Sequence, residues 1–310
     1  MENTRAKTTR NSLILLLTAT IWGMAFVSQS KGMDYMHPFT FNGVRSLIGA
    51  AGILVYILIS RKIAGDKAAK LDWKLNVKAG LLCGIFLTTA STLQQFGIKY
   101  TSVGKAGFIT TLYIIFVPMF GIFLKKKVAP VVWAAAGMAA VGMYLLCMTE
   151  SLRLGAGDIM VFLCAIAFAI QIMTVDHYAA RIDGAVVSCI QFTVCGVVCC
   201  IGALIWGQPT FGQIQEGLGA LLYAGVLSCG VGYTLQIVGQ KGLNPTVAAL
   251  IMSLESVIAT ISGWIAYKIG FLSTDQTLTP RQIAGCVIVF AAVILVQLPP
   301  EWFRFGKKNA

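Results

Sequence analysis

Residues 93–99 read LQQFGIK and residues 235–241 read LQIVGQK, so leucine, glutamine, glycine and lysine recur at one spacing, 142 positions apart. Self-similarity of this kind indicates a chain built from repeated units. Other pairs follow in the same order, at this offset or with a few residues of slippage: Ala25 and Ala167, Phe26 and Phe168, Gln29 and Gln171, Arg45 and Gln191, Ala106 and Ala248, Leu112 and Leu254, Gly137 and Gly285. Two copies of one unit are therefore predicted, at 11–148 and 156–298.

The sequence around these pairs is apolar over most of its length. The chain has 310 residues, 57% apolar and 12% charged, and a mean hydropathy of +0.79. Soluble domains carry roughly twice that charged fraction, whereas about twenty consecutive apolar residues cross a bilayer as a helix. Ten such stretches are present: 11–31, 38–60, 76–97, 103–124, 128–148, 156–175, 184–206, 217–239, 245–268 and 279–298. We predict an all-α membrane protein of ten transmembrane helices, forming a single membrane domain over 1–310.

Each predicted copy contains five of the ten spans. Because five is an odd number, the second copy must enter the membrane in the opposite orientation to the first. Two inverted five-helix repeats, related by an axis in the membrane plane, are the architecture of many secondary transporters. A binding site on that axis can be reached from either side of the membrane.

The formal charge of +12 comes from Lys and Arg residues that cluster in loops on alternating sides. Seventeen lie on one side of the predicted topology and six on the other. Such an imbalance places the richer side in the cytoplasm, so both termini are predicted to be cytoplasmic. The distribution favours the lipid bilayer as the partner of these charges and argues against nucleic acid.

Among 36 charged residues, only Arg45 and Glu255 lie well inside predicted spans. A charge at bilayer depth costs about 2.5–3.5 kcal/mol on insertion scales, and is by default a functional candidate. Glu255 is interpreted as a site for a substrate amine or a proton, or as a structural acid paired with Arg45, a tyrosine or the backbone. The repeat offset places Tyr113 opposite Glu255, so both are expected to face one cavity.

Arg45 lies about seven residues inside its predicted span, where its long side chain could still reach the interface. An anchoring role and contact with a substrate carboxylate both remain open for it. The other candidate substrate-binding residues are amides, aromatic residues and their neighbours on the same spans: Trp22, Gln29, Gln94, Thr110, Gln171, Tyr233, Gln236 and Met252. Hydrogen bonding between helices is the simpler account of each amide taken singly. Pro118 is expected to interrupt the fourth span.

Nine cysteines all fall inside predicted spans, and the cluster of Cys195, Cys199 and Cys200 has no acid or histidine beside it. Buried cysteines of this kind pack as small apolar residues, so no metal site and no cofactor are predicted. The two histidines, His37 and His177, sit at span ends, and no H-E-x-x-H motif occurs. No catalytic residue is assigned, and an intramembrane enzyme is a weaker alternative than a passive channel or facilitator.

The order of several motifs resembles the EamA-type branch of the drug/metabolite transporter superfamily. The matching features are Trp22-Gly23 with Phe26 and Gln29, Arg45 in the second span, Gly104 to Pro118 in the fourth, and Leu254-Glu255-Ser256-Val257 in the ninth. Two features depart from that pattern: Ser256 stands where the family often has proline, and Lys125-Lys126-Lys127 where many members have Gly-Glu.

The resemblance implies a secondary transporter of a bacterial inner membrane, exporting amino acids or related amines by alternating access. It also implies a central cavity lined by both repeats. Protons as a coupling ion and uncoupled exchange both fit the sequence, as do a monomer and a homodimer.

Overall fold

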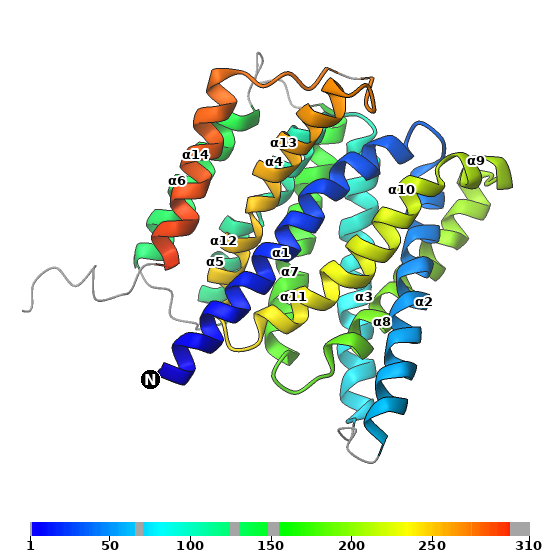
Figure 1. The fold of residues 1–310 in the computed structure, drawn as a ribbon, viewed down its shortest axis with the longest axis horizontal. Helices are drawn as coiled ribbons and strands as arrows, with labels where there is room; N and C mark the ends of the chain where they lie inside the picture. Colours follow the sequence, from blue (N-terminus) through cyan, green and yellow to red (C-terminus); the bar gives the residue numbers. More distant parts are fainter. Residues whose placement is uncertain (1, 66–70, 125–129, 148–154, 274, 298–310) are drawn as a thin grey trace, which may run out of the picture.

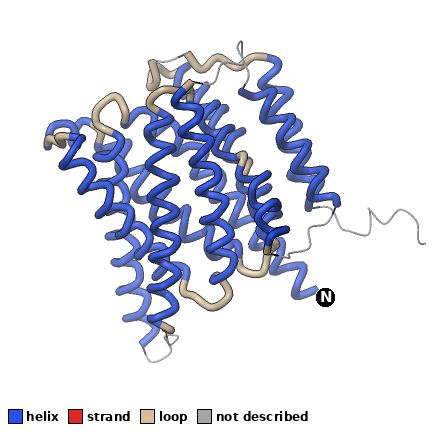
Figure 2. Tube along the Cα trace, turned by 180° about the vertical axis from the view of Figure 1, so that it is seen from behind, coloured by secondary structure: helices blue, strands red, loops and turns tan. Residues whose placement is uncertain are grey.

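The computed structural model describes residues 2–65, 71–124, 130–147, 155–273 and 275–297, and this part of the chain is helical, with no strand (Figures 1 and 2). The elements of the first half are α1 (Glu2–Gly32), α2 (Pro38–Ala64), α3 (Trp73–Ile98), α4 (Val103–Thr111), α5 (Tyr113–Phe123) and α6 (Pro130–Cys147). Those of the second half are α7 (Ala156–Tyr178), α8 (Gly184–Gly202), η2 (Ala203–Gly207), α9 (Phe211–Glu216), α10 (Leu218–Leu222), η3 (Tyr223–Gly232), α11 (Tyr233–Gln240), α12 (Pro245–Met252), α13 (Leu254–Lys268) and α14 (Pro280–Gln297). The all-α prediction is confirmed.

Eight segments of the described chain are long and apolar enough to cross a membrane: 6–32, 38–64, 73–98, 103–123, 156–178, 184–207, 218–240 and 245–268. They coincide with eight of the ten predicted spans. The other two predicted spans correspond to α6 and α14, which are 18 residues each. Their apolar stretches within the described chain, Pro130–Gly142 and Pro280–Leu295, are shorter. The chain is thus a multi-pass membrane protein. The departure from the family pattern at Lys125-Lys126-Lys127 lies outside the described residues.

Polar residues mark where several helices begin. The side chains of Asp72, Asp183 and Asn244 accept hydrogen bonds from backbone N–H groups in the first turns of α3, α8 and α12. Such caps satisfy donors that no helical carbonyl can reach. Pro245 follows Asn244 at the first position of α12, where its missing N–H costs nothing.

The helices form one bundle in which neighbours come from both halves of the chain (Figure 1). α1 packs on α13, α3 packs on α7 and α8, and α2 packs on α8, whereas α6 and α14 lie together at one edge. We call the side that holds the chain's N-terminus the N-terminal side. There Asn11 Nδ2 donates a 2.7 Å hydrogen bond to the carbonyl of Lys241. The opposite side holds the turn between α1 and α2.

Glycines allow the closest of these contacts. A Cβ added to Gly80 would lie 2.6 Å from Ile190 Cβ, and one added to Gly84 would lie 2.9 Å from Val194 Cβ, so this Gly-x-x-x-Gly pair seats α3 on α8. Helices in lipid gain no hydrophobic driving force from meeting, and small residues compensate by letting backbones approach.

The fourth and ninth membrane-crossing segments are each broken near their middle. The break between α4 and α5 falls at Leu112, and the break between α12 and α13 falls at Ser253. At each break a hydroxyl bonds a carbonyl three residues earlier: Thr111 Oγ1 to Phe108 at 2.8 Å, and Ser253 Oγ to Leu250 at 2.7 Å. The two hydroxyl residues, Thr111 and Ser253, are 142 positions apart, and the breaks at Leu112 and Ser253 match this offset to within one residue.

The expectation that Pro118 interrupts the fourth span is wrong in position. Pro118 lies inside α5, and the chain departs from the α-helix six residues earlier. There the N–H of Leu112 bonds the carbonyl of Ile109, and the N–H of Ile115 bonds that of Leu112, both with i to i+3 spacing. This tighter turn is the local geometry of a 3₁₀ helix, and it reorients α5 relative to α4.

Candidate functional site

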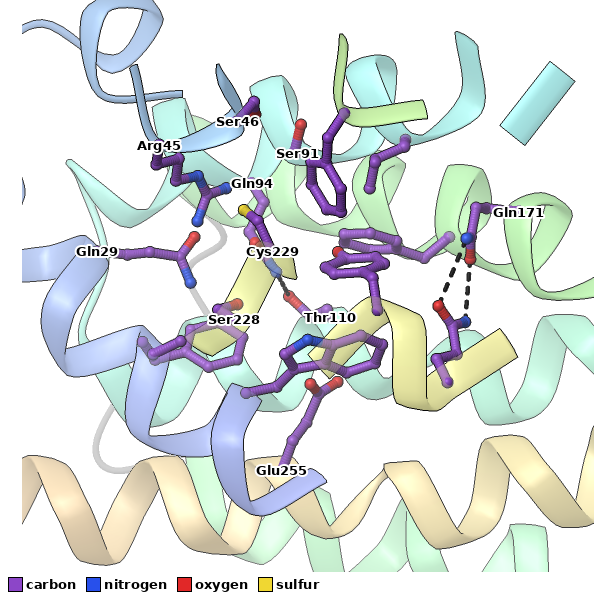
Figure 3. A pocket seen from close by; sticks show the side chains of 18 of the residues that line it. Gln29, Arg45, Ser46, Ser91, Gln94, Thr110, Gln171, Ser228, Cys229 and Glu255 are labelled. Atoms are coloured by element: carbon purple, nitrogen blue, oxygen red, sulfur yellow. Dashed lines mark hydrogen bonds between the residues drawn. The ribbon is translucent and has the colours of Figure 1, made fainter. Parts of the chain in front are cut away.

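A small polar cavity lies at the centre of the bundle and is lined by helices of both halves (Figure 3). Its volume is about 40 Å³. Ten of the eleven predicted substrate-binding residues line it: Trp22, Gln29, Arg45, Gln94, Thr110, Tyr113, Gln171, Tyr233, Gln236 and Glu255. Residues from both halves of the sequence are thus brought together around one space.

Glu255 and Tyr113 meet in this cavity, each at the first turn that follows a helix break. The phenol of Tyr113 donates a 2.9 Å hydrogen bond to Glu255 Oε1. Glu255 is 4% exposed and Tyr113 is 2% exposed. A buried carboxyl without a partner is costly, so the phenol offsets part of that cost. The positions are 142 residues apart, as the repeat predicts.

Gln171 and Gln236 line the end of the cavity nearer the N-terminal side, and Gln191 lies beside them. Gln236 Nε2 donates to Gln171 Oε1 at 3.1 Å, and Gln171 Nε2 donates to both Gln236 Oε1 and Gln191 Oε1 at 3.5 Å. The pair of Gln171 and Gln236 therefore bridges α7 and α11 directly. Figure 3 shows these bonds at one end of the cavity, away from Gln29 and Arg45.

The equivalent residues at the other end are not joined to one another. Gln94 Nε2 donates to Thr110 Oγ1 at 3.1 Å. The side-chain oxygen of Gln29 is buried and accepts no hydrogen bond. Arg45 Nε is also buried, and its N–H has no acceptor. Arg45 is 6% exposed and its guanidinium lies over the ring of Phe41, 5.4 Å from the centroid. The Arg45 side chain therefore lines the cavity, and does not extend to the membrane interface.

Aromatic rings form much of the wall between these ends. Trp22 and Tyr233 have ring centroids 4.5 Å apart, and Tyr233 meets Phe192 edge-on at 5.0 Å. Trp22 Nε1 is buried without an acceptor, which leaves one N–H donor of the wall unused. Nearby, Ser228 and Cys229 line the cavity from η3, a π-helical turn. Such wide turns are rare and occur often at functional sites.

Met252 is the predicted residue that does not line the cavity. It is fully buried in the apolar core. A continuous helix would put it on the same face as Glu255, but the helix breaks at Ser253, and the N–H of Ser256 bonds the carbonyl of Ser253. The tighter turn rotates α12 relative to α13 and turns Met252 away.

Further lining residues were not among the predicted candidates: Ala25, Phe26, Ser46, Leu87, Ser91, Phe168, Ile172, Phe192, Ser228 and Cys229. Several of them carry a usable repeat signal. Phe26 and Phe168 are 142 positions apart, and Ser46 and Phe192 follow the aligned pair of Arg45 and Gln191. Small hydroxyl side chains in apolar helices carry no such signal unless their partner is also polar.

The cavity can bind polar groups but holds little volume in this conformation. About 40 Å³ exceeds the 10–15 Å³ that one water needs, and it is well below the roughly 300 Å³ of a typical small-molecule pocket. Its charged side chains and amides are all at most 6% exposed. Among the described residues, no three acids, histidines or cysteines gather as a metal site would require. A metabolite would therefore need the helices around the cavity to move apart.

A bundle of membrane-crossing helices, broken at matching positions around a buried polar cavity, is the arrangement of a small-molecule transporter. Comparison with known proteins agrees with this class. The sequence model of the EamA-like transporter family matches residues 10–148 and again residues 155–298. The chain belongs to this family.

Known relatives are similar over nearly their whole length. An uncharacterized transporter of Archaeoglobus fulgidus is 28% identical over 290 residues, covering 92% of this chain and 84% of that protein. The uncharacterized transporter YwfM of Bacillus subtilis is 24% identical, covering 94% of each chain. A crystal structure at 16% identity superposes with a TM-score of 0.73, covering 96% of this chain and 99% of the other, and so shares the fold. These names point to a transporter and not to an enzyme.

Proposed function

We propose that this protein is a secondary transporter that carries a small metabolite by alternating access, with the central cavity as its substrate site. The observation that carries the proposal is the composition of that cavity. It is buried between the two halves, and it gathers pairs of residues at the repeat offset: Gln29 with Gln171, Gln94 with Gln236, and Tyr113 with Glu255. A site shared in this way can open toward either side when one half rocks against the other.

An inverted repeat of two five-helix units, 11–148 and 156–298, underlies this mechanism. It is supported by the two separate matches of one family model and by the breaks at Leu112 and Ser253, which occupy similar positions in the two units. If α6 and α14 both cross the membrane, each unit has five spans and the orientations must be opposite. The excess of Lys and Arg on one side supports cytoplasmic termini, in a bacterial inner membrane as the family resemblance implies.

Amino acids or related amines are the proposed substrates, moved outward. The buried acid Glu255, the amides and the aromatic wall suit a small ligand that carries an ammonium group and an apolar part. Glu255 is also the residue through which a proton could be coupled to transport. A passive channel would need a continuous path, whereas the described side chains at both ends of the cavity are buried.

The test is flux into proteoliposomes that contain the full chain, using a panel of radiolabelled amino acids and amines, with and without a pH gradient. We expect saturable flux that unlabelled substrate on the far side accelerates, because a carrier returns faster when loaded. Glu255→Gln is expected to lower flux at least tenfold, and the exposed Glu216→Gln is the matched control. Unchanged flux in Glu255→Gln would reject Glu255 as a site residue, and non-saturable flux without trans-stimulation would favour a channel.

A further inference from the structure

Arg45 is a buried cation without an acidic partner. The ion pairs formed by described residues join Lys31 to Asp34 and Lys105 to Asp158, and neither involves Arg45. Its Nε–H has no acceptor, and its guanidinium lies over the face of the Phe41 ring. A buried charge is costly unless it is paired and hydrogen-bonded, so this arrangement leaves a favourable place for an anion.

Glu255, the other charge of the cavity, does not fill this role. Its carboxyl accepts from Tyr113, and it forms no ion pair with Arg45. Figure 3 shows Arg45 and Gln29 at one end of the cavity, and Glu255 farther along toward Gln171. The two charges therefore face the same space from separate positions.

The repeat shows that a cation is not needed at this position for packing. The residue aligned with Arg45 is Gln191, which lies on α8, the helix that packs on α2. At that end an amide suffices, and Gln191 accepts from Gln171. At the Arg45 end the equivalent Gln29 leaves its side-chain oxygen without a donor. Gln191 Nε2 is likewise buried without an acceptor, so the two ends are related in sequence and differ by one positive charge.

The backbone of α2 at this point is held firmly in place. A Cβ added to Gly225 of η3 would lie 2.9 Å from the carbonyl oxygen of Arg45, and one added to Gly49 would lie 2.9 Å from that of Gly225. This close contact of α2 with η3 leaves the Arg45 side chain directed into the cavity, beside Ser228 and Cys229 (Figure 3).

We propose that Arg45 is the anion-binding residue of the cavity and that the transported ligand carries a carboxylate, which binds at this end. A guanidinium presents donors in a planar fork that matches a carboxylate. The Gln29 oxygen can accept from an N–H or O–H of the same ligand. Glu255 then lies on the ligand's other side, which selects a zwitterion over a simple amine. This inference rests on the proposed function in one respect: it takes the ligand bound in the cavity to be the molecule that is transported.

Binding to the purified full-length protein tests the assignment by thermal shift, because a ligand that binds the native state raises its melting temperature. The probes are L-alanine, L-leucine and L-phenylalanine, each with its carboxamide, its decarboxylated amine and its deaminated acid, plus chloride. We expect at least one carboxylate-bearing series to bind at least tenfold more tightly than its carboxamide and its amine. Arg45→Gln should abolish that difference, and the exposed Arg10→Gln should not.

The melting temperature of the protein without ligand shows whether Arg45 serves to bind a ligand or to anchor the fold. If Arg45 is held for a ligand, Arg45→Gln removes an unpaired buried charge and leaves the unliganded protein at least as stable as the wild type. Should Arg45→Gln fail to fold, Arg45→Lys provides the same test, because it keeps the charge and loses the fork. We expect it to bind carboxylates at least threefold more weakly and to bind carboxamides unchanged.

Four results would overturn the inference: equal affinity for carboxamides and acids, no carboxylate that binds, wild-type carboxylate affinity in both Arg45 variants, or an Arg45-dependent shift with chloride alone. The flux assay keeps this inference distinct from the proposed function. Arg45-dependent binding of carboxylates without flux would reject transport and retain the anion site. Saturable flux of amines without any preference for carboxylates would retain transport and reject the anion site.

Discussion

At the scale of single residues, the cavity is organised by a few polar groups whose partners are scarce. The phenol of Tyr113 donates a hydrogen bond to Glu255, and both side chains are buried. Trp22 Nε1, Gln29 Oε1 and Arg45 Nε all lie buried without a partner. Unsatisfied polar atoms are rare in stable interiors and mark places that keep them for a reason. Three of the ten such side-chain atoms among the described residues line this one cavity.

Tyr113→Phe is expected to lower the free energy of unfolding by about 1–3 kcal/mol, the cost of leaving a buried acceptor without its donor. Equilibrium unfolding in mixed detergent measures the loss. The control is Tyr56→Phe, because Tyr56 is exposed and should contribute almost nothing. A double-mutant cycle with Glu255→Ala isolates the interaction between the two side chains, because alanine removes the accepting oxygen. Additive effects in that cycle would contradict the hydrogen bond.

At the scale of elements, the site depends on where helices break and where glycines let them touch. α13 begins next to Glu255, and its early turns cross α1 at Gly23. A Cβ on Gly23 would lie 2.5 Å from Ile258 Cβ and 2.8 Å from the carbonyl oxygen of Glu255. The same glycine that allows the crossing therefore also sets the depth of the acid in the cavity.

Gly23→Ala is expected to destabilise the protein by about 1–3 kcal/mol, as overpacked cores usually do, and to reduce flux because α13 and Glu255 must shift. Gly52→Ala is the matched control: Gly52 lies within α2, and a Cβ there would meet nothing within 4 Å. Its stability should stay within about 1 kcal/mol of the wild type, given the small preference of helices for alanine. The free energy of unfolding and the flux are measured for both variants. Equal stability and equal flux in the two would show that α1 and α13 do not cross tightly at Gly23.

At the scale of the whole molecule, an ion pair links the two halves on the side opposite the N-terminus. Lys105 Nζ, at the start of α4, lies 2.6 Å from Asp158 Oδ2 in α7. Asp158 also accepts from Thr101 Oγ1 and from the N–H of Gly155, each at 2.9 Å. The Asp158 side chain is 4% exposed, whereas that of Asp34, in the other ion pair, is 50% exposed.

Asp158→Asn is expected to lower the free energy of unfolding by about 1.5–3 kcal/mol, the range for hydrogen bonds to charged groups. Asp34→Asn is the control, because exposed ion pairs contribute about 0–1 kcal/mol. The comparison is made by equilibrium unfolding at one ionic strength. A loss in Asp34→Asn as large as that in Asp158→Asn would show that burial does not set the strength of the pair that joins the halves.

Much of the fold and part of the site could be predicted from the sequence. Hydropathy located the membrane-crossing helices because a helix that crosses the hydrocarbon core of a bilayer must be long and apolar. The offset of 142 paired Tyr113 with Glu255 because equivalent positions of two copies meet at their interface. Small residues such as Ser91 and Cys229 were missed, since their contact with the cavity depends on how helices face one another and not on their polarity.

By itself, the sequence predicted that the chain lies in a membrane and that Arg45 and Glu255 are buried charges, because apolar length and side-chain charge are local properties. The tertiary structure alone decided that the breaks fall at Leu112 and Ser253, that Met252 turns away from Glu255, and that Arg45 faces the cavity without an acid beside it. Those outcomes depend on rotation and packing of whole helices against one another, and such contacts join residues that are distant in the sequence.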